Sequence, residues 1–425
     1  MNRRKEIFVV AFALFSLFFG AGNLILPPHL GFMAGDTWIW VTLGFAISAV
    51  IIPILGILAH ARLQGTLFDI AKKVSPTFSL VYCYLIYAVS ISLPSPRTAS
   101  VAHEMAILPL FESASWLTSS IYFFLVFLFV VNRSRILNLI GKFLTPGILL
   151  ILLTIIGITL TGFEFSFSAS EFTNPFSRAI LEGYQTFDAI GAVVVGGVII
   201  ISVNLKHKEL DFEAKRGLIG TAGIYAGLGL FLVYAGLILT GALMQGEFDN
   251  AISRTELLNG ISLKTLGSSA RLFLSLLVSL ACFTTAVGIV TGTADFVKGR
   301  FNESRRAYVI AAIIGCVLGV VMGQFNVAYI IAVALPTLMF MYPITIVLIL
   351  LNLLPEKWAS KNVFHWIVAV TILFSIPDFL ASVGQEAFST EFSKWIPLSE
   401  FHMGWVMPAL IVFIITSVIS KEQSD

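Results

Sequence analysis

The residues best suited to chemistry in this chain form a short run, Gly20-Ala21-Gly22-Asn23, inside the apolar stretch Ile7–Met33. That stretch is long enough to cross a membrane. Glycine weakens a helix, and Asn23 adds amide groups that need hydrogen-bond partners. Backbone groups freed by a helix break persist in a membrane only where protein buries them or where they line a wet cavity. We therefore predict a helix break at this run, with a site for small polar or charged groups beside it.

A break at this point offers two kinds of backbone group. Freed N–H groups over Gly20–Asn23 begin the second half-helix and suit a carboxylate, because the positive end of the helix dipole lies there. Freed carbonyl oxygens of Ser16, Phe18 or Phe19 end the first half-helix and suit a cation or an ammonium group. The alternative is a close helix-packing motif of small residues. The asparagine in the run and the following Pro27-Pro28 favour the break.

Asp188 is the one acidic residue that we place near the middle of an apolar segment. An ionised carboxylate there costs roughly 2.5–3.5 kcal/mol on insertion scales, so a functional role is the default assumption. The carboxylate could attract an amino group, coordinate Na⁺ or carry a proton. The alternative is a hydrogen-bonded structural aspartate that ties its helix to a neighbour.

A third group of polar residues is Thr284 and Thr285, which follow Ala281 in the middle of another apolar segment. Adjacent hydroxyl oxygens together with a nearby carbonyl oxygen are hard ligands that suit Na⁺. The alternative is that each threonine bonds a carbonyl in the preceding turn of its own helix.

Arg97 follows Pro94 and Pro96 within an apolar segment, and Glu104 lies beyond it. Two interpretations stay open: an ion pair of Arg97 with Glu104 that forms an outer gate, or an Arg97 side chain that extends to the membrane surface. Tyr84 and Tyr87 either wall a substrate cavity or pack against neighbouring helices.

The composition indicates a frame that holds these groups at membrane depth. Of 425 residues, 57% are hydrophobic and only 12% are charged, whereas a soluble globular chain is nearer a quarter charged. We predict an all-α polytopic membrane protein of about 12 transmembrane helices that forms a single domain over residues 1–425. The twelve apolar segments are Ile7–Met33, Trp38–Ala61, Thr77–Met105, Trp116–Val131, Gly141–Gly162, Ala179–Val203, Gly217–Met244, Ser268–Val297, Arg306–Gly323, Asn326–Leu354, Phe364–Ser382 and Met403–Ile419. The long Asn326–Leu354 segment has the alternative of a re-entrant pair.

The distribution of Lys and Arg predicts the orientation. With the N-terminus in the cytoplasm, all but six of the 26 Lys and Arg residues fall on the cytoplasmic side. Arg97 lies inside a segment, and the five on the opposite side are Arg178, Arg254, Lys264, Arg271 and Lys394. This positive-inside bias, together with an even number of segments, predicts that both termini are cytoplasmic.

The first and sixth segments share an interruption at similar depth. Asp188 lies about nine residues into the sixth segment, roughly 14 Å deep at 1.5 Å per residue, and the Gly20–Asn23 run is also near mid-depth. The two segments run in opposite directions. We therefore predict two inverted five-helix repeats, roughly residues 7–162 and 179–354, followed by two C-terminal helices within 364–419, with a midplane site where the broken helices meet.

Three stretches together resemble the bacterial branched-chain amino acid:cation symporter family of the amino acid–polyamine–cation superfamily. They are Phe19-Gly20-Ala21-Gly22-Asn23-Leu24-Ile25-Leu26-Pro27-Pro28, Pro96-Arg97-Thr98-Ala99 and Gly183-Tyr184-Gln185-Thr186-Phe187-Asp188-Ala189-Ile190-Gly191. The resemblance covers essentially the entire chain. It implies a LeuT-type fold, with broken helices 1 and 6, and Na⁺-driven uptake of leucine, isoleucine and valine.

The resemblance also implies roles for individual positions. The substrate carboxylate would be held by the broken first helix, at Gly20, Ala21, Gly22 and Asn23. The substrate amino group and side chain would meet Phe187, Asp188 and Gly191. A Na⁺ site shared by many symporters of this fold corresponds here to Ser16, Phe19, Ala281, Thr284 and Thr285.

We therefore expect a multi-pass protein of the plasma membrane that imports L-leucine, L-isoleucine and L-valine with Na⁺ by alternating access. Its expected partners are these amino acids and membrane lipid, with no nucleic acid and no obligate protein partner. The main alternative is a proton-coupled or exchange amino acid transporter of the same fold, with Asp188 as the proton carrier. A nutrient sensor and an intramembrane enzyme are further alternatives, and the sequence has neither the GxSxG nor the HExxH pattern of an enzyme.

Overall fold

In the computed structural model, residues 3–132, 145–267, 270–385 and 395–422 are described, and every regular element among them is a helix. The first half of the chain contains α1 (Arg3–Phe18), α2 (Ala21–Ala34), η1 (Gly35–Thr37), α3 (Trp38–Ala46), η2 (Ile47–Ile51), α4 (Ile52–Leu63), α5 (Leu67–Ala71), α6 (Pro76–Ser92), α7 (Pro94–Ala102), η3 (His103–Ile107), α8 (Ser115–Val131) and α10 (Thr145–Gly162). The second half contains α11 (Pro175–Tyr184), α12 (Asp188–Lys206), α13 (Phe212–Leu243), α14 (Arg254–Leu266), α15 (Ala270–Arg300), α16 (Arg305–Met322), α17 (Val327–Leu353), α18 (Lys361–Ser382), η7 (Ser399–Phe401) and α20 (Val406–Glu422).

These helices account for the twelve predicted segments. Within the described residues, nine helical stretches are long and apolar enough to cross a membrane, and α8 and α20 are shorter apolar helices. Four of the predicted segments consist of more than one helix: α1 with α2; α3 with η2 and α4; α6 with α7 and η3; and α11 with α12. The alternative of a re-entrant pair over 326–354 is wrong, because α17 is one helix of 27 residues.

Both predicted breaks are present. Helix α1 ends at Phe18, α2 begins at Ala21, and the intervening Gly20 has extended backbone (φ −111°, ψ −161°). A Cβ on Gly20 would lie 2.6 Å from the Oγ1 of Thr285, so the close approach of α15 leaves room only for glycine. The second break lies between Tyr184 at the end of α11 and Asp188 at the start of α12.

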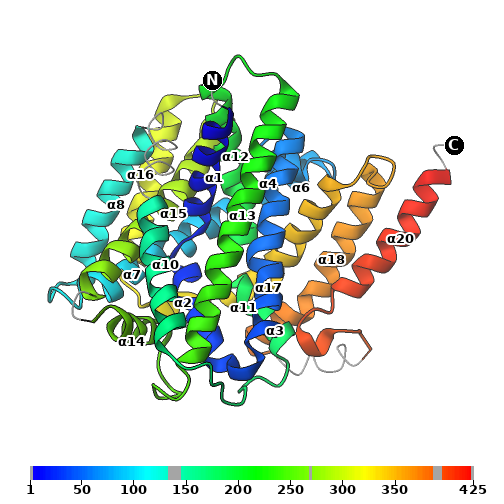
Figure 1. Ribbon diagram of the computed structural model, residues 1–425. Coiled ribbons are helices and arrows are strands. Elements are labelled where there is room, and N and C mark those ends of the chain that lie inside the picture. The colour runs from blue at the N-terminus through cyan, green and yellow to red at the C-terminus, as the bar shows by residue number, and fades with distance from the viewer. Residues whose placement is uncertain (1–2, 133–144, 268–269, 386–394, 423–425) are drawn as a thin grey trace.

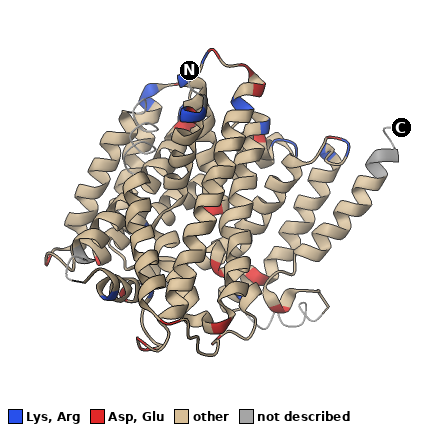
Figure 2. Ribbon diagram, in the orientation of Figure 1, with Lys and Arg blue, Asp and Glu red and all other residues tan. Residues whose placement is uncertain are grey.

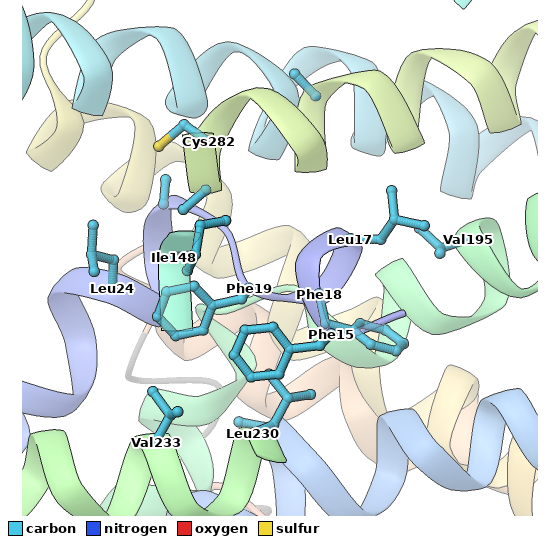
Figure 3. Close-up of a cluster of buried hydrophobic side chains, with 14 of the residues drawn as sticks. Phe15, Leu17, Phe18, Phe19, Leu24, Ile148, Val195, Leu230, Val233 and Cys282 are labelled. Atoms are coloured by element: carbon cyan, nitrogen blue, oxygen red, sulfur yellow. The ribbon is translucent and has the colours of Figure 1, made fainter. Parts of the chain in front are cut away.

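Packing places the first break at the centre of the bundle. Helix α13 lies against α1, α2 and α4, and α12 lies between α4 and α15. Figure 3 shows the apolar side chains around the first break, among them Phe15, Phe18 and Phe19 of the chain at the break itself and Leu230 and Val233 of α13. These side chains pack around the break and hold the two half-helices against the neighbouring helices.

Helices α17, α18 and α20 follow one another along one edge of the bundle (Figure 1). Helix α1 begins and α20 ends at the same end of the bundle, which we call the amino-terminal end. Lys and Arg gather mainly at this end (Figure 2). Helix α14 lies at the opposite end, in a stretch between two spans that the hydropathy pattern left as a connection.

Candidate functional site

The two helix breaks face each other through side chains. The Nδ2 of Asn23, in the first turn of α2, donates to the Oδ2 of Asp188 at 2.5 Å and contacts the Oη of Tyr234 from α13 at 2.5 Å. All three residues are buried. The amide therefore joins the start of α2, the start of α12 and the middle of α13 in one polar cluster inside an otherwise apolar bundle.

The start of α2 has backbone donors to spare. The first N–H groups of an α-helix have no partner within the helix. Gly20 occupies the N-cap position and supplies no side-chain cap, so the N–H groups of Ala21, Gly22 and Asn23 depend on other acceptors. The positive end of the α2 dipole thus points into the centre of the bundle, where it favours an anion.

The start of α12 is different, because protein groups already cap it. The N–H of Asp188 donates to the Oγ1 of Thr186 at 3.2 Å, and the N–H of Ala189 donates to the Oη of Tyr342 at 3.0 Å. Phe187, at the N-cap position, has left-handed backbone with φ +64°, which is an outlier for a bulky residue. This turn brings the Asp188 carboxylate to the positive end of its own helix, where a negative charge is stabilised.

A small central cavity of about 30 Å³ lies between the two breaks. A cavity of this size has room for water, but it must widen to admit a larger molecule. It contains most of the predicted substrate residues, and a Cβ on Gly191 would meet no atom within 4 Å. The lining residues are Leu17, Phe18, Gly20, Ala21, Asn23, Ser90, Pro94, Arg97, Thr98, Thr186, Phe187, Asp188, Ile190, Gly191, Val195, Thr285 and Ile289. Gly22 lies just behind this wall, against Arg97 and the carbonyl of Gln185.

Four of the five residues predicted to bind Na⁺ lie together where α1 meets α15. The Oγ1 of Thr284 contacts the carbonyl oxygens of Ser16 at 2.7 Å and Ala281 at 3.0 Å, and the Ser16 hydroxyl donates to it at 3.1 Å. The Oγ1 of Thr285 contacts the carbonyl oxygens of Leu17 at 3.2 Å and Ala281 at 3.3 Å. The threonines therefore make both the bonds within their own helix and bonds across to the end of α1.

The contacts of Phe19, the fifth predicted residue, involve its N–H group and its ring. Its N–H donates to the Phe15 carbonyl at 2.7 Å, and its ring stacks on Phe15 and Tyr234. The Leu17 carbonyl, which accepts from Thr285, adds a further oxygen to this cluster. The Phe19 carbonyl stays a predicted ligand.

Arg97 lies in the central cavity, and neither interpretation of it from the sequence was right. Its side chain is only 3% exposed, its Nη1 donates to the carbonyl of Gln185 at 2.7 Å, and its guanidinium lies 5.2 Å from the Phe187 ring centre. Glu104 accepts a bond from the N–H of Val327 instead. The cost of an arginine well inside an apolar segment was the signal that could have identified it as a site residue.

A second cavity of about 240 Å³ lies toward the amino-terminal end, between Thr66, which follows α4, and Arg300, which ends α15. Tyr87 lines this cavity and stacks on Phe296, whereas Tyr84 is 53% exposed on the outer surface of the bundle. Neither tyrosine lines the central cavity, and both rings contact Phe296, so of the two alternatives the structure favours packing over a wall of the substrate cavity.

A third cavity of about 550 Å³ lies at the opposite end, where α14 meets α11. Arg254 of α14 pairs with Glu182 at 3.0 Å and donates to the Oε1 of Gln185 at 2.7 Å. Arg178 pairs with the other Glu182 oxygen at 3.1 Å. These bonds fix α14 to the end of α11, next to the second break.

A capping box fixes the start of α14 and so positions Arg254. The Ser253 hydroxyl and N–H both donate to the Glu256 carboxylate, and these bonds lower the pKa of Glu256.

The central site as a whole offers an uncapped helix start, one carboxylate, one guanidinium and a cluster of neutral oxygens. That set can hold a small molecule with separated positive and negative charges and, next to it, a hard cation.

Comparison with known proteins gives the same overall picture. Residues 3–423 match the family described as branched-chain amino acid transport protein. The branched-chain amino acid permease BraB of Bacillus subtilis is 30% identical, with 98% of this chain and 96% of that protein aligned. The branched-chain amino acid transport system 2 carrier protein of Pseudomonas aeruginosa is 29% identical, with 98% and 96% aligned.

Two solved structures are similar over nearly the entire chain. MhsT in complex with L-phenylalanine aligns with a TM-score of 0.57 at 15% identity and covers 97% of this chain and 98% of its own. A substrate-bound Na⁺-coupled sialic acid symporter in an outward-open state aligns with a TM-score of 0.59 at 14% identity and covers 97% and 90%. The likeness confirms the predicted LeuT-type fold.

Proposed function

The chain belongs to the branched-chain amino acid transport protein family, and we propose that it imports leucine, isoleucine and valine together with Na⁺. The family consists of transport proteins, which removes the intramembrane enzyme from the alternatives. The chain is a multi-pass membrane protein. The choice of amino acid, the coupling ion, the plasma membrane and the orientation form the proposal.

The hydrogen bond between Asn23 and Asp188 is the observation that carries the proposal. It joins the two breaks and leaves an uncapped helix start and a carboxylate on one small cavity. In the proposed complex the substrate carboxylate accepts bonds from the N–H groups at the start of α2. The substrate ammonium group lies at Asp188, which carries the complementary charge.

The remaining wall of the cavity suits an aliphatic side chain. Leu17, Ile190, Val195 and Ile289 line it with apolar groups. Complete burial of a leucine side chain contributes about 1.5–3 kcal/mol, which favours leucine, isoleucine and valine over alanine. The open space beside Gly191 is where the larger side chains would extend.

The oxygen cluster of Ser16, Leu17, Ala281, Thr284 and Thr285 fits Na⁺, which is co-transported as cargo. Carbonyl and hydroxyl oxygens are hard ligands without charge, and α1 ends here, so its dipole adds negative potential. The threonine hydroxyl hydrogens would turn away from the carbonyl oxygens when the ion binds. Ion binding would thus hold α1 against α15 and bias the equilibrium between conformations by its differential affinity.

The proposed orientation puts the amino-terminal end, where Lys and Arg gather, in the cytoplasm. Access to the central cavity from the opposite, outer end is then closed by the bonds between Arg254 and α11. The 240 Å³ cavity at Thr66 and Arg300 lies on the inner path. Alternating access would open one of these paths as the other closes.

Uptake by reconstituted vesicles tests the proposal. We expect an inward Na⁺ gradient to drive accumulation of radiolabelled leucine, and unlabelled isoleucine and valine to compete, with choline replacing Na⁺ as the control at matched pH. Equal uptake with and without the gradient would contradict the Na⁺ coupling. The second candidate, proton coupling or exchange through Asp188, predicts that a pH gradient without Na⁺ is sufficient and that Asp188→Asn spares exchange.

A further inference from the structure

We propose that the Arg97 guanidinium binds the carboxylate of the transported amino acid, so that Arg97 and Asp188 together recognise both charged groups of the substrate. This inference rests on the proposed function and adds a substrate-binding residue to it. The guanidinium would bind the same carboxylate as the N–H groups at the uncapped start of α2.

The position of Arg97 meets the first requirement of such a role. Its side chain lines the central cavity and is 97% buried within the bundle. Among the described residues, its guanidinium donates one hydrogen bond, from Nη1 to the carbonyl of Gln185, and its Nε is buried without a hydrogen-bond partner. A guanidinium has five N–H donors. Donors therefore remain for a ligand that can accept two parallel bonds.

Electrostatics supply the second argument. A Cβ on Gly22 would lie 2.6 Å from the Nη2 of Arg97, so the guanidinium is next to the first turn of α2. The positive end of a helix dipole and a full positive charge thus meet in the interior, where their repulsion is weakly screened. Within the described residues, Arg97 and Asp188 form no ion pair. A carboxylate in the cavity that accepts from both Arg97 and the N–H groups of α2 would replace this repulsion with two attractions.

The chemistry of the guanidinium gives the third argument. Its planar fork matches a carboxylate in a bidentate arrangement, and the Phe187 ring beneath it, at 5.2 Å, restricts its plane. The competing interpretation is purely structural, since Arg97 also caps the Gln185 carbonyl at the end of α11. The two interpretations differ in whether substitution of Arg97 weakens binding only of ligands that have a carboxylate.

The binding of L-leucine and of L-leucinamide distinguishes the substrate-binding role of Arg97 from a purely structural one. L-Leucinamide keeps the amino group and side chain of leucine but replaces the carboxylate with a neutral amide. Dissociation constants for L-leucine and L-leucinamide would be measured on the purified full chain for the wild type, Arg97→Gln and Arg97→Lys. Arg216→Gln is the matched control, since Arg216 is exposed on α13 and pairs with Glu213.

We expect the wild type and Arg216→Gln to prefer leucine over leucinamide by about 10- to 100-fold, and Arg97→Gln to lose most of this preference through weaker leucine binding alone. Arg97→Lys keeps the charge but not the planar guanidinium, so its preference for leucine over leucinamide should fall about threefold or more. Equal losses for both ligands, or an unchanged preference, would overturn the assignment.

Two further readouts keep the test decisive. Size-exclusion chromatography and melting temperature report whether Arg97→Gln folds, and if it does not, Arg97→Lys decides by the same criterion. Failure of the proposed function looks different, because the wild type itself would then neither bind leucine nor transport it. Loss confined to the Arg97 variants therefore concerns only this inference.

Discussion

The side-chain amide of Asn23 donates to the carboxylate of Asp188 across 165 residues of sequence, and in doing so it joins the two helix breaks. Each residue lies at its own break, so the bond couples the position of α2 to that of α12. When one of these half-helices moves, either the bond breaks or the other half-helix moves with it.

Asn23→Ala should lower Na⁺-driven leucine uptake by about tenfold or more. Removal of the amide leaves the buried Asp188 carboxylate with one donor fewer, and hydrogen bonds to charged groups contribute about 1.5–3 kcal/mol. Initial uptake rates in vesicles would be compared with those of Asn132→Ala, whose exposed amide donates to the Leu128 carbonyl of its own helix. Similar rates in the two variants would contradict a role for the bond.

Thr284→Ala and Thr285→Ala should each raise the Na⁺ concentration for half-maximal uptake by about tenfold, because each removes one hydroxyl oxygen from the cluster at Ser16 and Ala281. Serine at either position keeps the oxygen and should keep near-normal Na⁺ dependence. Thr293→Ala is the control on the same helix, since its hydroxyl bonds only the Ile289 carbonyl. The idea fails if all the alanine variants share the Na⁺ dependence of Thr293→Ala.

Gly191→Ala should change substrate selection without harming the fold. The added methyl group meets no atom within 4 Å, so it takes space from the central cavity alone. Overpacking of about 1–3 kcal/mol should weaken leucine and isoleucine binding about 10- to 100-fold and spare smaller amino acids. Competition for uptake by leucine, valine and alanine would measure this. Gly157→Ala on α10, also free of close neighbours, should leave selection unchanged.

Arg254→Gln should loosen α14 from α11. It removes the ion pair with Glu182, and a partly exposed pair of this kind contributes up to about 1 kcal/mol, or roughly a fivefold change in local opening. Amide hydrogen exchange over residues 254–266 should therefore become about fivefold faster. Lys264→Gln, on the same helix and paired with Glu247, controls for the loss of a charge. Equal exchange in both variants would show that Arg254 does not fix the helix.

His402 should make the stability of the C-terminal region depend on pH. Its hydrogen bond to Asp378, at 3.3 Å, raises its pKa above the ordinary value of about 6.5, although burial and Arg178 oppose the shift. A raised pKa gives stabilisation that is complete below about pH 6.5 and is lost as the pH rises through the folded value.

The melting temperature of the wild type should therefore exceed that of His402→Gln most at low pH, and the difference should shrink as the solution becomes alkaline. His365→Gln is the control, because His365 is exposed and bonds only a carbonyl of its own helix. A difference that grows with pH would reverse the predicted sign.

The sequence was sufficient to predict both breaks, because the residues that cause them are local. A glycine run and an asparagine at membrane depth have few other uses, and a lone aspartate in a span is costly enough to stand out. The adjacent pair Thr284 and Thr285 was found in the same way, although the assignment of a partner on α1 came from the family resemblance. The bond from Thr285 to the Leu17 carbonyl was not predicted, because spacing along the chain does not define which carbonyl of α1 faces α15.

The partners from distant helices could not be predicted in this way. Tyr234 and Tyr342 supply hydroxyl groups to the two breaks, yet in the sequence each is one aromatic residue within an apolar helix. Hydropathy predicts that such a side chain lies within the membrane, but it does not predict which atom its hydroxyl group contacts. The partner of Arg97 was predicted wrongly for a related reason. Glu104 is close to Arg97 in sequence, but the residues that Arg97 contacts, Gln185 and Phe187, come from the other half of the chain.

The opposite charges of Arg97 and Asp188 on one cavity have an electrical consequence. With Arg97 and Asp188 both ionised, the charges of the cavity wall cancel and a zwitterionic substrate adds none, so in the proposed symport Na⁺ would be the only net charge carried inward. Membrane voltage then acts on that ion alone, at about 2.3 kcal/mol per 100 mV. That work is equivalent to a roughly 40-fold concentration ratio of the amino acid, before any ion gradient is counted.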